Sequence, residues 1–241
     1  MKEKLRLPDK VHVTAVAAIG PNRELGMGDG LPWGRVKEDM KFFRDLTMCG
    51  VVLMGRVTFD GIVKAIGGPL PGRDCVVLST TQHSCGEHGT TNKRRLVFTD
   101  DLSDWASWFD TSRPVFVVGG AAIYNLMLPQ CAELALTHIS ADICGPADCF
   151  FPDYSVEFMP FSEKTLSDKA TCKFYTRTSV VYRQFHEAVD KLCRSKFGMG
   201  WQELCGDQDP LLAAFHSILT PEEFVADWGE KYDLAFLDGS G

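Results

Sequence analysis

One acidic side chain, Asp39, falls on the apolar face of a predicted helix. With 100° per residue from Val36 onward, the apolar residues occupy one arc, and Asp39 lies inside it, between Phe43 and Leu46. The charged residues, among them Glu38, occupy the other arc. A carboxylate on an apolar surface is unfavourable unless it is paired. The pattern therefore predicts either an anion that meets a polar ligand or a core residue that caps nearby backbone.

Three strand ends carry groups that attract anions. In "FVVGGAAIY", Gly119 and Gly120 stand between a strand and a helix, where the backbone can approach a phosphate and free amides face it. In "LMGRVTF", Gly55 and Arg56 repeat the arrangement, and the guanidinium adds a forked donor. In "VLSTT", hydroxyls follow a strand at 79–81. Each motif alone is commonly an ordinary turn. Together they predict a ligand with several phosphates across the carboxyl edge of a sheet.

The turn "GGPLPGR" places a cation next to an aliphatic side chain. Arg73 ends the turn and Leu70 lies within it, among prolines and glycines that make it rigid. A guanidinium beside apolar surface suits an amphiphilic acid with an apolar middle. A purely structural turn of this composition is common, so the motif alone is weak evidence.

Cysteine and histidine spacing does not indicate a metal site or a disulfide framework. The nine cysteines are scattered without CxxC spacing. The tightest cluster is His83, Cys85 and His88, in a Gly/Thr-rich stretch that favours a solvated loop. We therefore predict no metal, reduced thiols and a cytoplasmic location.

The elements that must position these residues alternate along the chain. Short hydrophobic runs with helical segments between them predict an α/β fold with a mainly parallel central sheet. The predicted strands are Val11–Ile19, Val51–Met54, Cys75–Leu78, Arg95–Phe98, Val115–Val118, Leu134–Ile139 and Lys173–Arg183. The predicted helices are Val36–Met48, Phe59–Ile66, Leu102–Phe109 and Ala121–Leu128. The N-terminus resembles a signal peptide in its basic start and short apolar run, but Glu3, Asp9 and His12 do not fit one. We therefore predict a first strand there.

Beyond Arg183 the alternation of strand and helix patterns gives way to helical patterns. Phe185–Lys196 has a helical pattern, and "TPEEFVADW" has Thr220 at the cap with Glu223 closing a capping box. No recognisable chemistry follows. We predict two parts, residues 1–183 and a helical extension, residues 184–241, which packs on the body or on a second copy of the chain.

Composition and charge exclude some classes of partner. Apolar residues make up 45% and charged residues 24% of the 241 residues, which is ordinary for a globular protein. A net charge of -7 argues against a general nucleic-acid surface. No apolar run approaches the roughly 20 residues that span a bilayer. We expect neither a nucleic-acid nor a membrane partner.

The motifs together resemble the dihydrofolate reductase family. "VAAIGPNRELGMGDGLPW", "DMKFFRDLT", "VVLMGRVTF", "GGPLPGR", "VVLSTT", "VFVVGGAAIY", "LALTHI" and "CFFPDY" occur in that family's order and spacing, from Lys10 to Arg183. The resemblance implies an eight-stranded sheet flanked by helices. It also implies NADPH-dependent reduction of 7,8-dihydrofolate to tetrahydrofolate for one-carbon metabolism, and inhibition by antifolates.

The resemblance bears directly on Asp39. The family's acid follows the Trp of "LPW" by five residues in many bacteria, which would select Glu38, and by six in animal and protozoan members, which would select Asp39. The helical arc favours Asp39, because Glu38 lies on the polar side. Its partners would then be the pterin amino group and ring NH.

The resemblance implies further residues around the substrate. Leu31 would lie on a mobile loop that Trp33 anchors, Thr137 would hydrogen-bond Asp39 directly or through water, and Arg73 would grip the glutamate α-carboxylate. The remaining substrate positions implied are Val16, Ala18, Met40, Phe43, Ile66, Leu70, Val118 and Tyr124.

For the cofactor, Arg56, Ser79 and Thr80 would meet the adenosine 2′-phosphate of NADPH, and the Gly119–Gly120 pair would receive the pyrophosphate. The full set implied is Ala18, Leu25, Gly55, Arg56, Val57, Thr58, Leu78, Ser79, Thr80, Val118, Gly119, Gly120, Ala121, Ala122, Ile123 and Tyr124. Ala121 departs from the glycine or serine common in the family but keeps the amide.

Two rival functions stay open at this point. A same-fold reductase of a pyrimidine riboflavin precursor would lack the inward acid and the PLPGR cation, and this chain has both. A non-catalytic folate or NADPH binder is not favoured, because the catalytic positions are filled. Protozoan relatives are fused to thymidylate synthase, and the extension after Arg183 is far too short for that domain. A remnant of such a junction is one further reading of the extension.

Overall fold

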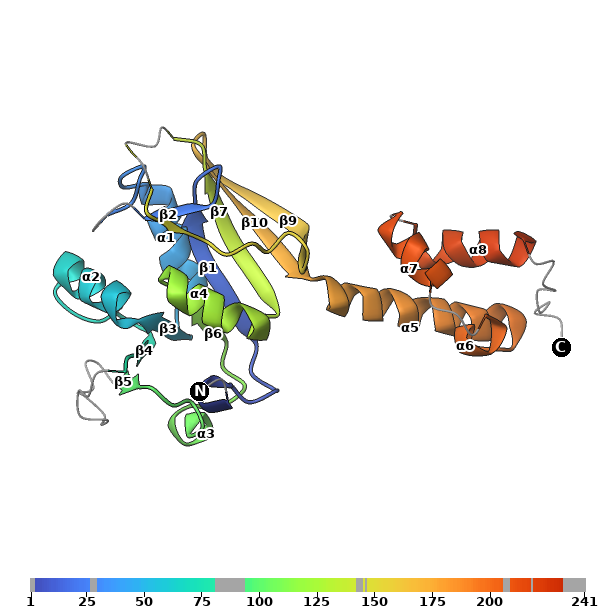
Figure 1. Ribbon diagram of the computed structural model, residues 1–241, viewed down its shortest axis with the longest axis horizontal. Helices are drawn as coiled ribbons and strands as arrows, with labels where there is room; N and C mark the ends of the chain where they lie inside the picture. The colour runs from blue at the N-terminus through green and yellow to red at the C-terminus, as the bar shows by residue number, and fades with distance from the viewer. Residues whose placement is uncertain are drawn as a thin grey trace. The chain divides into compact units, whose positions relative to one another are not determined.

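The computed structural model divides into two compact units, Met1–Thr176 and Arg177–Gly241 (Figure 1). It describes residues 3–26, 30–80, 94–141, 145, 147–205, 209–217 and 219–231. Thr81 and the cluster of His83, Cys85 and His88 lie outside the described residues.

The first unit is built on a mixed sheet. Within the described residues this sheet has eight strands in the order β5-β4-β3-β6-β1-β7-β10-β9. Neighbours from β5 to β7 are parallel, and β10 runs antiparallel to β7. The strands are β1 Val13–Ile19, β3 Val51–Gly55, β4 Asp74–Leu78, β5 Leu96–Thr99, β6 Val115–Val117, β7 Glu133–Ile139, β9 Phe158–Ser167 and β10 Ala170–Arg177. The mainly parallel sheet predicted from the sequence is confirmed.

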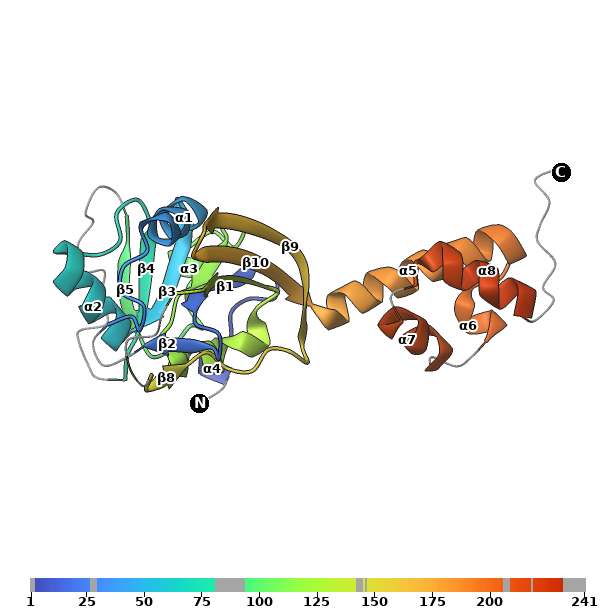
Figure 2. The same cartoon turned by 90° about the horizontal axis from the view of Figure 1, so that it is seen from above.

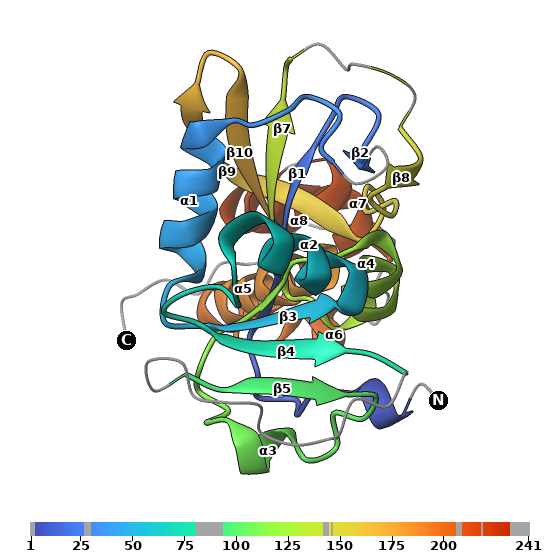
Figure 3. The same ribbon diagram turned by 90° about the vertical axis from the view of Figure 1, so that its left-hand side faces the viewer.

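Helices cover both faces of this sheet, with α1 on one side and α4 on the other (Figures 2 and 3). Side chains alternate along a strand, so β1 sends Ala15 and Ala17 to a core cluster with α4 and sends Val16 to a cluster with α1. The helices are α1 Lys37–Thr47, α2 Arg56–Ile66, α3 Trp105–Trp108 and α4 Ala121–Met127, with short 3₁₀ turns at η1 Glu3–Leu5 and η2 Leu128–Gln130. A separate pair of short strands joins β2 Glu24–Gly26 to β8 Cys149–Phe150.

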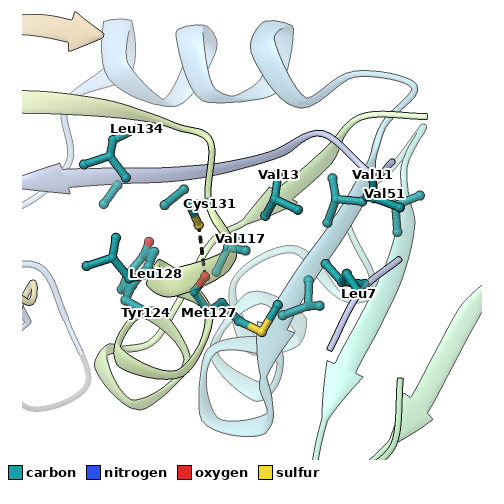
Figure 4. Close-up of a cluster of buried hydrophobic side chains, with 14 of the residues drawn as sticks. Leu7, Val11, Val13, Val51, Val117, Tyr124, Met127, Leu128, Cys131 and Leu134 are labelled. Atoms are coloured by element: carbon teal, nitrogen blue, oxygen red, sulfur yellow. Dashed lines mark hydrogen bonds between the residues drawn. The ribbon is translucent and has the colours of Figure 1, made fainter. Parts of the chain in front are cut away.

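The core on the α4 side packs the end of α4 and the start of η2 against the sheet (Figure 4). Met127 and Leu128 pack there with strand residues such as Val13 and Leu134. The Cys131 thiol donates to the carbonyl oxygen of Met127 over 3.3 Å. This packing holds α4 against the sheet.

At the end of the first unit one prediction is wrong and one strand was not predicted. The strand predicted at Lys173–Arg183 ends at Arg177, and a helix begins at Thr178. Three of the four residues 178–181 are β-branched and favour a strand by propensity, but Tyr182 and Phe185 stand at helical spacing and pack into the second unit's core. The edge strand β9 was not predicted, because its Pro and charged residues resemble a loop; edge strands tolerate both.

The second unit has an aromatic core of its own. Its helices are α5 Thr178–Phe197, α6 Trp201–Leu204, α7 Asp209–His216 and α8 Pro221–Lys231. Phe185, Trp201 and Phe224 are buried together in this unit, and Leu192 is partly buried beside them. The predicted capping box is confirmed: the Thr220 amide donates to Glu223 Oε2 over 2.9 Å, and the Glu223 amide donates to Thr220 Oγ1 over 3.2 Å.

Two further findings concern the whole described chain. All seven cysteines that the structure describes are free thiols. None of the described helices combines the length and apolarity that crossing a membrane requires.

Candidate active site

Asp39 lies on the inward side of α1, as the helical arc predicted. It is partly buried, whereas Glu38 and Lys41 are exposed. Its carboxylate is hydrogen-bonded to the side chain of Thr137 on β7. Burial raises the pKa of Asp39 above its ordinary value, and the Thr137 hydrogen bond acts in the opposite direction. The structure therefore places one carboxylate, and not its neighbour, against the sheet.

The sheet beneath α1 presents two rows of side chains. The register of β1, β7 and β10 aligns Ala18, Thr137 and Cys172 in the first row and Val16, Ala135 and Phe174 in the second. Residues two apart in a strand are separated by about 6.7 Å, and residues four apart in a helix by about 6 Å. Asp39 and Phe43 of α1 therefore match the rows: Asp39 meets Thr137, and Phe43 packs in the cluster that holds Val16.

Trp33 brings an unused donor to the first row. Its side chain is only 8% exposed and packs in a cluster with Ile139 and Ala18. Its indole Nε1 is buried and has no hydrogen-bond partner within the described residues. A buried donor without a partner is unfavourable and is available to a ligand or a water molecule.

Arg73 is held in a fixed position next to Phe43. It is 4% exposed, with Nε donating to the Pro71 carbonyl oxygen over 3.0 Å and Nη1 donating to Thr47 Oγ1 over 3.1 Å. Its guanidinium carbon lies 5.9 Å from the centroid of the Phe43 ring. Burial lowers the pKa of Arg73 from its ordinary value. No carboxylate of the described chain pairs with it, so an anionic ligand would relieve an unpaired buried charge.

Thr47 is a residue that sequence reasoning missed. It is fully buried, and its hydroxyl donates to the Phe43 carbonyl oxygen over 2.8 Å while accepting from Arg73. The signal was available, because Thr47 follows Phe43 by four residues on the same side of α1. Thr47 ties the cation to the helix that carries Asp39.

Apolar side chains near these polar groups are exposed. Leu31 is 45% exposed, Met40 44% and Ile66 53%, and Leu70 is partly buried. Single exposed apolar side chains are ordinary at a protein surface, and only a contiguous patch indicates a binding site. The contacts of the described residues join Asp39, Thr137 and Trp33 around Ala18 and join Arg73 to Phe43; they do not link Leu31 or Ile66 to either group.

After the carboxyl end of β6, Gly119 and Gly120 form the predicted turn, and the peptide bond between them is cis. Gly119 has φ of +103°, and a Cβ there would lie 2.9 Å from the Tyr124 ring. The Gly55 amide donates to the Gly119 carbonyl oxygen over 2.7 Å. A Cβ on Gly55 would meet Ile123 at 2.8 Å. Only glycines allow these two loops to approach so closely.

Two helix N-termini therefore lie together. A Cβ on Gly120, the residue before α4, would lie 3.4 Å from the Thr58 hydroxyl in the first turn of α2. Neither helix has a side-chain hydrogen bond at its N-cap. Arg56 opens α2 and pairs with Asp60 over 3.3 Å. Ala121 and Ala122 open α4, and Val57 is 87% exposed on α2. Uncapped helix amides together favour an anion.

The strand register places hydroxyls beside Arg56. Gly55 of β3 pairs with Leu78 of β4, so the residues that follow, Arg56 and Ser79, leave adjacent strands. Ser79 is partly buried and Thr80 is exposed. A cation and hydroxyls at neighbouring strand ends are a suitable setting for a phosphate.

Tyr124 connects the two ends of the site. Its hydroxyl donates to the Val16 carbonyl oxygen over 2.7 Å, and burial raises the pKa of Tyr124 far above its ordinary value. A carbonyl oxygen has two lone pairs, so the Val16 carbonyl can accept a second hydrogen bond. Val118 is partly buried between the clusters beneath α1 and α2, and Leu25 packs against the cluster on the α4 side.

A family model described as dihydrofolate reductase matches residues 12–184. The chain belongs to the dihydrofolate reductase family. The type A13 dihydrofolate reductase of Escherichia coli is 34% identical over 165 residues, which cover 68% of this chain and 92% of that protein. The dihydrofolate reductase of Buchnera aphidicola subsp. Acyrthosiphon pisum is 31% identical over 61% of this chain and 82% of that protein.

A solved structure shares the fold. This dihydrofolate reductase, from Enterococcus faecalis in complex with NADP(H) and RAB-propyl, matches with a TM-score of 0.54 at 22% sequence identity. The match covers 69% of this chain and 96% of that one. The family resemblance drawn from the sequence motifs is confirmed, and the family match ends seven residues into α5.

Proposed function

We propose that this chain catalyses the NADPH-dependent reduction of 7,8-dihydrofolate to 5,6,7,8-tetrahydrofolate, and so supports one-carbon metabolism. The observation that carries the proposal is the partly buried Asp39 carboxylate, hydrogen-bonded to Thr137 at the carboxyl ends of β1 and β7. Family membership supports the same reaction.

Asp39 is the residue that orients the pterin. As the site's inward carboxylate it accepts hydrogen bonds from the pterin amino group and ring NH, and it raises the basicity of the ring nitrogen next to the carbon that is reduced. Direct proton transfer from Asp39 to that nitrogen is too long in the family's geometry, so a water molecule is the final donor. The unused Trp33 N–H suits the role of holding such a water.

The residues around Phe43 account for how the rest of the substrate binds. The pterin and the aminobenzoyl ring pack against Phe43 and Met40, with Leu70 and Ile66 on the far side. Arg73 receives the glutamate α-carboxylate as a fork. Ala18 and Val16 lie beneath the pterin, and the second lone pair of the Val16 carbonyl accepts from it. Antifolate inhibitors of similar shape bind at the same place.

The residues at the other strand ends fit NADPH. When bound, NADPH supplies the hydride. Arg56, Ser79 and Thr80 would hold the 2′-phosphate, with Val57, Thr58 and Leu78 beside it. Gly119–Gly120 and the amides of Ala121–Ile123 would receive the pyrophosphate. Ala18, Leu25, Val118 and Tyr124 would surround the nicotinamide, and Leu31 would close over it. Stacking of donor and acceptor in a dry pocket is mainly a positioning task.

All positions assigned here fall within residues 1–183, and we propose that this part is the reductase. Residues 184–241 then pack or self-associate without contributing to the site. A chain that ends at Gln184 tests this division: turnover should be retained, while the melting temperature or the mass in solution changes. A folded truncation without activity would show that the extension belongs to the site. Free thiols support the cytoplasm as its location.

A spectrophotometric assay tests the proposed function. The full chain is incubated with dihydrofolate and NADPH, and the absorbance of reduced nicotinamide is followed. We expect loss of absorbance that requires both compounds. Binding of both without turnover would support a non-catalytic binder, and turnover only with a pyrimidine riboflavin precursor would support the rival reductase.

A further inference from the structure

A buried carboxylate at the start of β4 has no part in the reaction proposed above. Asp74 directly follows Arg73 and is 3% exposed. Its Oδ1 accepts a hydrogen bond from the Arg95 amide, and its Oδ2 accepts one from Arg113 Nη1. Arg94 Nη1 lies 3.7 Å from the same Oδ2. A buried carboxylate is tolerated when it is paired and hydrogen-bonded, so these contacts hold Asp74 in one position.

Arg113 joins three neighbouring strands at their amino ends. It stands two residues before β6, and Asp74 begins β4. Its Nη2 donates to the carbonyl oxygens of Cys49 over 2.7 Å and of Gly50 over 3.2 Å. These two residues belong to the link between α1 and β3, and β3 lies between β4 and β6 in the sheet. One guanidinium therefore uses both branches of its fork, one on a carboxylate and one on the backbone.

The same link holds the turn that carries Arg73. The Cys49 amide donates to the Gly72 carbonyl oxygen over 3.3 Å, and the Asp74 amide donates to the Gly50 carbonyl oxygen over 3.2 Å. Gly72 and Asp74 are the residues on either side of Arg73. Cys49 has φ of +63°, a left-handed conformation that a residue other than glycine keeps where its surroundings impose it. The guanidinium bound to its carbonyl oxygen is part of those surroundings.

We propose that Arg113, paired with Asp74, is a positioning residue for the glutamate end of the substrate. By fixing the link at residues 49–50 and the start of β4, it keeps the Arg73 guanidinium in place for a carboxylate before the substrate binds. Preorganisation of this kind lowers the cost of binding. The inference rests on the proposed function, in which Arg73 receives the glutamate α-carboxylate.

The effect should fall on substrate binding rather than on hydride transfer. Arg73 donates to Thr47 at the end of α1, beside the link. Asp39 lies eight residues before Thr47 on the same helix, which is about 12 Å along the helix axis. A shift of the link therefore moves Arg73 more than it moves Asp39. Losing a contact that is equally strong in the bound substrate and in the transition state raises KM and leaves kcat unchanged.

Arg113→Lys separates the two branches of the fork. Lysine keeps a positive charge opposite Asp74, so the buried carboxylate stays paired, but one ammonium group on a flexible stem does not hold the carboxylate and the link together. KM for dihydrofolate should rise about tenfold, because part of a charge-assisted hydrogen bond to the substrate is lost. The turnover number should stay within about twofold. For 6-methyl-7,8-dihydropterin, which lacks the aminobenzoylglutamate, kcat/KM should not change.

A double-mutant cycle tests whether Arg113 acts through Arg73. Steady-state kinetics of the full chain with saturating NADPH give KM for Arg73→Met, for Arg113→Lys and for the two combined. With Arg73 already replaced, Arg113→Lys should add nothing to KM. Arg95→Lys is the matched control, because the Arg95 guanidinium also donates to a backbone carbonyl oxygen, that of Trp108 on α3 over 2.6 Å. Its KM should equal that of the unchanged chain.

An unchanged KM for dihydrofolate in Arg113→Lys would overturn the proposal, and so would an equal loss with 6-methyl-7,8-dihydropterin or a fully additive effect in the combined variant. If Arg113→Lys does not fold, Asp74→Asn combined with Arg113→Gln gives the same comparison, since it removes both charges of the pair together. No reduction of dihydrofolate by the unchanged chain would reject the proposed function. Reduction by that chain with an equal KM in the variant would reject this inference alone.

Discussion

The two faces of β7 differ in what they bury. Toward α4 the strand presents Leu134 and Leu136, both 0% exposed, in an apolar core. Toward α1 it presents Ala135 and Thr137, and Thr137 hydrogen-bonds the carboxylate of Asp39. Adjacent residues of one strand thus serve two purposes. The α4 face supplies stability by burying apolar area, whereas the α1 face keeps a polar group in a position that is unfavourable without a ligand.

Among variants that distinguish the two faces of β7, Asp39→Asn should have the largest effect on turnover. This change keeps the shape of the side chain and removes its charge, and catalysis by a positioned acid or base is worth about 10²–10⁴-fold. Turnover of dihydrofolate should fall on that scale, and lower pH should partly restore it because substrate protonated in solution needs less help. Binding of NADPH, measured by fluorescence titration, should be almost unchanged. Loss of NADPH binding would show that the variant is damaged more widely.

A change on the opposite face should act on stability alone. Leu136→Ala removes a fully buried side chain and should lower the free energy of unfolding by about 2–5 kcal/mol. Urea denaturation measures this loss. The pH profile of turnover of the folded protein should stay as it was. Thr137→Val, one residue along on the α1 face, should alter the pH profile. The comparison fails if Leu136→Ala shifts the profile and Thr137→Val does not.

A smaller effect is expected at the phosphate end. Arg56→Ala should weaken NADPH binding by about 1.5–3 kcal/mol, the range for a hydrogen bond to a charged group, and should hardly affect NADH. Michaelis constants for both cofactors measure the difference. Arg6→Ala is the control, since Arg6 also pairs with an acid, Asp9 over 2.8 Å, but is not among the positions assigned to the substrate or the cofactor. Equal losses for NADPH and NADH in Arg56→Ala would reject the assignment.

The same comparison predicts how Asp39 affects stability. Burial raises its pKa in the folded state, so between the unfolded and folded pKa values the native protein holds more protons than the unfolded chain. Stability therefore falls as pH rises through that window. Asp39→Asn lacks this loss and should melt at a higher temperature than the unchanged protein at neutral pH, with no such gain at acid pH. Melting curves across pH check this, with Glu38→Gln, exposed on the same helix, as the control. A lower melting temperature for Asp39→Asn at neutral pH would contradict the account.

Local sequence patterns predicted much of the fold and of the candidate site. The helical phase placed Asp39 inward and Glu38 outward, and the glycine motifs marked two strand-to-helix turns, because both depend on residues near in sequence. Long-range register was not predictable in this way. The pairing of Cys172 with Thr137 depends on how β10 aligns with β7, which no local pattern specifies.

Tertiary packing explains the features that the sequence did not predict correctly. The start of α5 at Thr178 contradicts the β-propensity of the residues there, because Tyr182 and Phe185 pack at helical spacing in the second unit. Thr47 was missed because its importance lies in a contact with Arg73, twenty-six residues further along the chain. Sequence patterns indicated which residues could take part in chemistry, and the pairing of the strands determines which of those residues are in contact.

The most direct test of the central claim compares Asp39→Asn with Glu38→Gln. The two positions are adjacent in α1, but one faces Thr137 and the other faces solvent. The turnover number for dihydrofolate is measured for both variants and the unchanged chain at neutral pH with saturating NADPH. We expect Glu38→Gln to stay within about twofold of the unchanged chain and Asp39→Asn to lose at least about 10²-fold. A crippled Glu38→Gln beside an active Asp39→Asn would contradict both the helical phase and the role of Asp39.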